Sequence, residues 1–115
     1  MTLGEAQREF MHDVGRLIIW AYENGYELTG ADLYRSRDAA VANAAAGSGI
    51  ANSLHCDRLA IDLNLFIGGV YQSTSEAHRP LGDYWKSLRP GVNFWGGDFQ
   101  KPDGNHYSRG WQGRK

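Results

Sequence analysis

The segment Leu59-Ala-Ile-Asp-Leu-Asn-Leu-Phe-Ile67 decides the fold class, because its apolar and polar residues alternate. Leucine and isoleucine side chains at positions 59, 61, 63 and 65 share one face, and Asp62 and Asn64 lie on the other. This period of two predicts a half-buried β-strand. Gly68-Gly69 is a tight hairpin signal, so Val70–Gln72 is expected to pair back as a second strand.

Helical patterns lie on both sides of this hairpin. An amphipathic repeat predicts a helix at Leu3–Asn24. An alanine-rich run predicts a second helix at Asp38–Ala46, and an apolar stripe that follows a proline predicts a third at about Pro80–Leu88. The second helix is expected to stop at Gly47-Ser48-Gly49. Weaker patterns predict a short or bulged strand within Tyr26–Arg35, which Thr29-Gly30 interrupts, and a last strand at Asn105–Arg109. The rest of the chain after Pro90 is rich in glycine, aromatic and turn residues and is expected to be loop.

The composition limits the classes of function. The 115 residues suit one domain, 1–115, and the net charge of -1 gives no field that would attract nucleic acid. Glu5 and Arg8 fall where a signal peptide would be apolar, and the longest apolar run, Leu17–Ala21, is too short for membrane insertion. We therefore expect a monomer that is made in the cytoplasm and needs another factor to let it out. The single cysteine, Cys56, excludes an internal disulfide and a four-cysteine zinc site.

Two histidines and two aspartates are the candidates for chemistry. His55, Asp62 and His106 supply three ligand types that Zn²⁺ accepts, and a metal so held lowers the pKa of bound water to about 7. The odd spacing between His55 and Asp62 requires a bend, for which Cys56-Asp57-Arg58 is the natural place. Asp103, three residues before His106, suits a general base. Each residue also has a structural explanation, as a solvated histidine, an exposed strand position or a turn former.

The combination resembles a known pattern. Ser53-Leu-His-Cys-Asp-Arg-Leu-Ala-Ile-Asp62 is similar to the Ser-x-His-(x6)-Asp signature of the M15 family of zinc peptidases. The resemblance spans roughly Arg35 to Tyr107, and it continues in Asp62–Phe66, Leu81–Trp85, Trp95-Gly-Gly-Asp-Phe99 and Asp103-Gly-Asn-His106. The family includes D-Ala-D-Ala carboxypeptidases and dipeptidases, and phage endolysins that cut between L-alanine and D-glutamate. The Trp-Gly-Gly segment and the short chain favour the endolysin branch.

The resemblance implies a role for each matching residue. His55, Asp62 and His106 match the zinc ligands, and Asp103 matches the catalytic carboxylate. Arg35 matches an arginine that holds the substrate or the oxyanion, and Ser53 matches a serine that supports the site by hydrogen bonding. Apart from the resemblance, Trp95 suits the substrate groove and the core equally and is assigned to the groove. Phe99 is expected in the core, and His78 is expected in a loop, where the sequence indicates no partner for it. Two positions depart from the pattern: many members have glycine in place of Arg58 and glutamate in place of Asp103.

The resemblance also implies a fold and a function. We expect an α+β domain, with a small antiparallel sheet and helices packed on one side, as in M15 peptidases and hedgehog-type domains. The implied activity is zinc-dependent hydrolysis of peptidoglycan stem peptides, with the L-alanyl-D-glutamate bond as the first candidate. The implied place of action is the periplasm of a Gram-negative host, after release through holin-made holes. One alternative function is a D-alanyl-D-alanine carboxypeptidase, in which Arg35 or Arg79 holds the free carboxylate. Two further alternatives are a glycosidase that uses Asp62 and Asp103, and a non-catalytic zinc-binding module.

Overall fold

The computed structural model describes residues 1–47 and 52–115, which form three α-helices, five strands and three short 3-10 helices. The α-helices are α1 (Leu3–Glu23), α2 (Arg37–Ala45) and α3 (Arg79–Leu88). The strands are β1 (Glu27–Gly30), β2 (Ala60–Ile67), β3 (Val70–Gln72), β4 (Asn93–Trp95) and β5 (His106–Arg109). The 3-10 helices are η1 (Leu54–Asp57), η2 (Glu76–His78) and η3 (Gly96–Asp98).

The strand predicted from alternation, β2, lies at the centre of the sheet. The strand order is β1-β2-β5-β4, β3 also pairs with β2, and every pairing is antiparallel. The turn at Gly68-Gly69 joins β2 to β3 as expected, and both glycines have positive φ. The leucine face of β2 is buried, with Leu63 3 % and Leu65 0 % exposed. The polar face is therefore free to carry chemistry.

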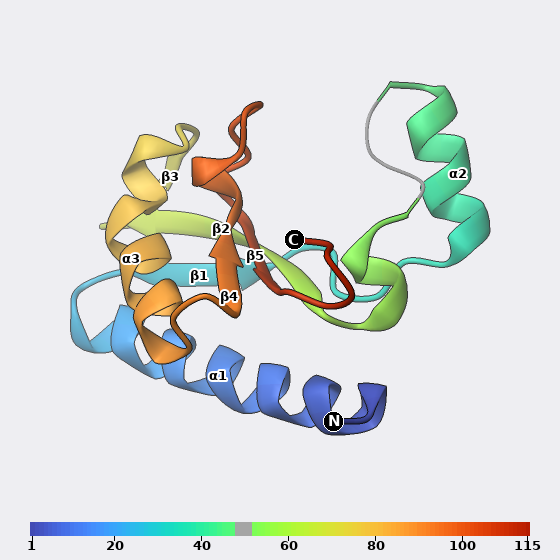
Figure 1. Ribbon diagram of the computed structural model, residues 1–115. Coiled ribbons are helices and arrows are strands. Elements are labelled where there is room, and N and C mark those ends of the chain that lie inside the picture. Colours follow the sequence, from blue (N-terminus) through green and yellow to red (C-terminus); the bar gives the residue numbers. More distant parts are fainter. Residues whose placement is uncertain (48–51) are drawn as a thin grey trace.

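Two helices cover the sheet and enclose the core. The capping box of Thr2 and Glu5 starts α1, which buries Phe10 and Leu17 among its apolar residues. Figure 1 shows α1 running along the sheet with α3 beside it, whereas α2 stands apart from both. In α2 only Ala40 is buried. The predicted α+β class is confirmed.

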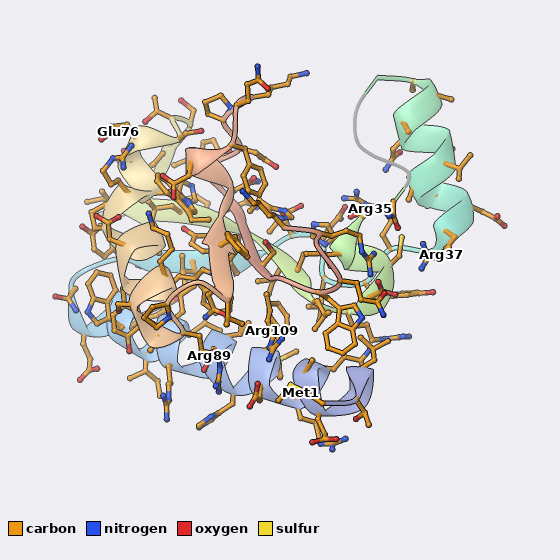
Figure 2. All side chains as sticks on the ribbon, viewed as in Figure 1. Met1, Arg35, Arg37, Glu76, Arg89 and Arg109 are labelled. Atoms are coloured by element: carbon orange, nitrogen blue, oxygen red, sulfur yellow. The ribbon has the colours of Figure 1, made fainter. Side chains whose placement is uncertain are left out.

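A buried polar cluster holds α1 against α3 and the sheet. Asp13 is fully buried and accepts hydrogen bonds from Arg89 Nε at 2.7 Å and Asn93 Nδ2 at 3.2 Å. One turn earlier, Glu9 accepts a hydrogen bond from Arg109 Nη2 at 2.7 Å. Figure 2 shows Arg89 and Arg109 beside α1. Both hydrogen bonds to Asp13 end on Oδ2, and because a buried carboxylate is costly without donors, these contacts help to fix how α1 docks.

The short or bulged strand expected within Tyr26–Arg35 is present as β1, over Glu27–Gly30. One expectation differs from the structure, because β4 lies in a segment expected to be loop. Of the predicted stop at Gly47-Ser48-Gly49, positions 48 and 49 lie outside the described residues. Among the described residues, no helix is both long and apolar enough to cross a bilayer.

Candidate metal centre

The pairing of β2 with β5 places Asp62 beside His106. The two residues are register partners on neighbouring antiparallel strands, so their side chains project from the same face of the sheet. His106 is the first residue of β5 and is 9 % exposed. Asp62 comes from the polar face of the central strand. The two side chains therefore meet because of the sheet register rather than through a flexible loop.

His55 reaches the same place because the chain bends just before β2. Ser53 caps η1, where its hydroxyl accepts a hydrogen bond from the backbone N–H of His55 at 3.1 Å. Arg58 ends η1 in the left-handed region, with φ 56° and ψ 40°. The predicted bend between His55 and Asp62 is thus present, at a backbone conformation that glycine adopts most readily. This conformation explains why a glycine is suited to position 58.

The three side chains converge on one point. Asp62 Oδ1 lies 3.3 Å from His55 Nε2 and 3.3 Å from His106 Nδ1. The three potential ligand atoms all lie within 4.8 Å of one another. Asp62 Oδ1 is buried and has no hydrogen-bond partner among the described residues, although two ring nitrogens are near it. A buried carboxylate oxygen without a donor is costly, and a cation between these atoms would satisfy it, so the donor set fits a metal ion.

The backbone orients the ring of His55. Its Nδ1 lies 3.0 Å from the carbonyl oxygen of Leu33, in the segment that follows β1. A carbonyl only accepts hydrogen bonds, so the contact holds the proton on Nδ1 and leaves the lone pair on Nε2, which faces Asp62. Metal-ligating histidines are commonly oriented by such a contact. The sequence contains no sign of this role for Leu33, because a backbone carbonyl is present at every position.

The charges of the three groups support one another. Burial alone would raise the pKa of Asp62, but His106 and His55 outweigh it and lower the pKa to about 2. Burial alone would lower the pKa of His55, but contact with Asp62 outweighs it and raises the pKa. The Asp62 carboxylate is therefore ionised at pH 7, as a metal-binding carboxylate must be.

Asp103 lies in the turn that leads into β5. Its backbone N–H donates to the carbonyl of Gly96 at 2.9 Å, and its own carbonyl accepts from the N–H of His106 at 3.1 Å. A Cβ at Gly96 would lie 2.1 Å from the carbonyl oxygen of Asp103, so only glycine allows this approach. Partial burial raises the pKa of Asp103, His106 opposes the shift and Asp62 adds to it. An acid with a raised pKa beside a candidate metal centre suits proton transfer.

A cavity of about 700 Å³ opens over the three ligand candidates, and Ser53, Asp103 and Arg35 also line it. Arg35 pairs with Asp32, whose Oδ2 accepts a hydrogen bond from Nη2 at 2.6 Å. Lys101 and Lys115 add two cationic side chains that sequence reasoning did not single out. Arg79 does not line this cavity. It pairs with Glu76, which Figure 2 shows far from Arg35.

The assignment of Trp95 to the substrate groove is wrong. Trp95 is 1 % exposed, and its indole N–H donates to the carbonyl of Gly104 at 2.7 Å. A Cβ added at Gly82 or at Gly97 would lie 2.2 Å from the Trp95 ring, so these two glycines make room for it in the core. Phe99, expected in the core, lines the cavity instead. Its ring lies 5.5 Å from that of His106.

The loop environment expected for His78 is also wrong, because its side chain is buried and has a partner. It is 3 % exposed at the end of η2, and its Nδ1 lies 2.8 Å from the hydroxyl oxygen of Tyr107. Burial lowers the pKa of His78 to about 4, and burial also raises the pKa of Tyr107. Both groups are therefore neutral at pH 7. The two residues are 29 positions apart in the chain, so no local pattern indicated the contact.

Comparison of the coordinates with solved structures gives a clear match. The fold is shared with an L-Ala D-Glu endopeptidase. That protein is ChiX of Serratia marcescens, which superposes with a TM-score of 0.70 at 21% sequence identity, over 93% of this chain and 85% of that chain. No family model matches the sequence, and no curated protein matches it either. The match therefore establishes the architecture, and the chemistry rests on the residues of the site.

Proposed function

We propose that this protein is a zinc-dependent peptidase of the M15 type that hydrolyses the stem peptides of peptidoglycan, with the L-alanyl-D-glutamate bond as the first candidate. The observation that carries the proposal is the convergence of His55, Asp62 and His106, with a buried Asp62 oxygen that lacks a partner. A zinc ion held by two imidazoles and a carboxylate supplies a Lewis acid and lowers the pKa of its bound water to about 7.

The residues around the candidate metal centre have complementary roles. His55 offers Nε2 because Leu33 orients its ring, and Asp62 contributes a permanent negative charge. We assign Asp103 as the general base that accepts a proton from the attacking water and later donates it to the leaving amine. Arg35 places a guanidinium at the same cavity, where it stabilises negative charge on the carbonyl oxygen of the substrate.

The substrate assignment rests on two supports. The sequence resembles a family that acts on peptidoglycan peptides, and the fold matches an L-Ala D-Glu endopeptidase. The cavity of about 700 Å³ lies within the range of volumes that hold a small peptide segment. We further propose that the protein acts as a monomer on the cell wall in the periplasm, which size-exclusion chromatography and fractionation of expressing cells will test.

A D-alanyl-D-alanine carboxypeptidase is the second candidate. Such an enzyme needs cationic groups for the free C-terminal carboxylate, and Arg35, Lys101 and Lys115 line the cavity. These side chains fit the carboxylates of an internal D-glutamate equally well. The identity of the released fragment therefore separates the two activities, since one leaves a new N-terminal D-glutamate and the other releases free D-alanine.

The decisive experiment is a digest of purified peptidoglycan with zinc-loaded protein, with and without a chelator, read by mass spectrometry. We expect fragments with an N-terminal D-glutamate, and we expect them to disappear when the chelator is present. Free D-alanine would support the carboxypeptidase instead. New reducing sugar ends that persist with chelator would point to the glycosidase and contradict the proposal.

Variants of Asp103 separate an enzyme from a zinc-binding module. Asp103→Ala is expected to lose nearly all turnover while keeping the zinc content of the wild type. Asp83→Ala removes an exposed aspartate on α3, outside the cavity, and should keep both properties. Full turnover by Asp103→Ala would remove this residue from the mechanism. A wild-type protein that binds zinc but cuts no peptide would leave the binding module as the function.

A further inference from the structure

A second cavity lies next to the candidate metal centre, across the turn that carries Asp103. It has a volume of about 250 Å³ and is formed by β3, by the residues that follow it and by the turn that precedes β5. Three residues, Pro102, Asp103 and Asn105, line both cavities. The two cavities therefore lie side by side at the turn that carries Asp103.

The second cavity is polar but almost uncharged. Gln72, Ser73 and Thr74 contribute an amide and two hydroxyls, and buried His78 contributes an imidazole. Asp103 is the only acidic or basic side chain among the described residues that line it, apart from this histidine. Such a lining recognises neutral groups that donate and accept hydrogen bonds, such as hydroxyls and amides.

The metal cavity has the opposite character. Arg35, Lys101 and Lys115 line it, and its acidic side chains are Asp62 and Asp103 at the candidate catalytic centre. Positive charge around a cavity favours anionic groups in a ligand. The two cavities on either side of the Asp103 turn thus differ in charge, and a substrate whose two ends differ in charge would bind in one direction.

A peptidoglycan stem has such an asymmetry. On the N-terminal side of its L-alanyl-D-glutamate bond, a lactyl amide joins L-alanine to a sugar that carries hydroxyl and acetamido groups. On the C-terminal side, D-glutamate has a free carboxylate, and the next residue carries another. Resting on the proposed function, we propose that the second cavity binds the sugar-proximal end of the substrate, while the carboxylates of D-glutamate and its neighbour lie in the metal cavity.

The proposal is tested with two soluble substrates that share the scissile bond. One is the tripeptide L-Ala-γ-D-Glu-diaminopimelate, and the other is the same peptide joined to N-acetylmuramic acid. Ser73→Trp fills the second cavity from an exposed position, whereas Val70→Trp places the same side chain on an exposed residue of β3 that does not line it. Zinc content and thermal unfolding show that each variant is folded and loaded.

We expect wild-type and Val70→Trp protein to cleave the muramyl peptide with a kcat/KM about tenfold above that for the bare peptide, equivalent to about 1.4 kcal/mol. Ser73→Trp should lose this preference, mainly through KM, and should cleave the bare peptide as the wild type does. An equal kcat/KM for the two substrates in the wild type would overturn the proposal, as would a preference that Ser73→Trp retains. If the wild type cleaves neither substrate, the proposed function itself has failed.

Discussion

Acidification from pH 7 to pH 5 is expected to remove about 2 kcal/mol of folding free energy through His78. Burial lowers the pKa of His78 from 6.5 to about 4, so between these values the unfolded chain binds a proton that the folded chain does not. The stabilisation by neutral His78 is therefore complete above pH 6.5 and is lost as the pH falls towards 4. At about 1.4 kcal/mol per pH unit, the loss reaches about 2 kcal/mol at pH 5 and about 3 kcal/mol at pH 4.

The assay compares the wild type with His78→Gln, which replaces the imidazole beside the Tyr107 hydroxyl by an amide that does not titrate. Urea unfolding is followed by tryptophan fluorescence at pH 7, 6 and 5, with a chelator present throughout so that metal binding does not contribute. The difference in unfolding free energy between the two proteins should shrink by about 2 kcal/mol from pH 7 to pH 5. The raised pKa of His55 affects both proteins and cancels. His12→Gln, at an exposed position of α1, is the matched control, and a His78→Gln difference that stays constant with pH would refute the reasoning.

Three further changes test the packing, the bend and the metal centre. Gly82→Ala forces a Cβ into the ring of Trp95 and should destabilise the fold by about 2 kcal/mol. Gly15→Ala, on the open face of α1, should instead stabilise the fold by up to about 1 kcal/mol. Urea unfolding that ranks the two variants in the opposite order would contradict the packing around Trp95. Arg58→Gly should be about 1 kcal/mol more stable than Arg58→Ala, because only glycine relieves the left-handed backbone; equal midpoints in urea would contradict this. Zinc at 100 times its Kd should stabilise the wild type by about 2.7 kcal/mol. Asp62→Ala should abolish the zinc-induced rise in Tm, and a variant whose Tm still rises with zinc would contradict the assignment of Asp62 as a ligand.

The sequence allowed prediction of the elements whose signals are local. The alternation of β2 and the amphipathic repeat of α1 both predict a face, and that face is buried in the structure. The odd spacing between His55 and Asp62 predicts a bend, and the left-handed Arg58 provides it. In each case, residues close together in the chain carry the information. The structure brings His55, Asp62 and His106 together, while their binding of zinc stays a prediction for experiment.

The elements that the sequence did not reveal depend on distant partners. The strand β4 has only three residues, and its pairing with β5 gives it a strand conformation that its own residues do not indicate. Trp95 lies inside because Gly82 and Gly97 make room for its ring, and Phe99 reaches the cavity because η3 turns the chain after β4. Large aromatic residues suit core and cavity equally, so their type alone does not decide between them.

The register between β2 and β5 has a consequence for when the candidate metal centre can form. Asp62 and His106 meet only after the last strand has closed onto the central one, and His55 is oriented only after the segment behind β1 has docked. A nascent or partly folded chain thus lacks a complete set of ligands. The candidate metal centre is therefore a product of tertiary structure, complete only when both of these contacts are in place.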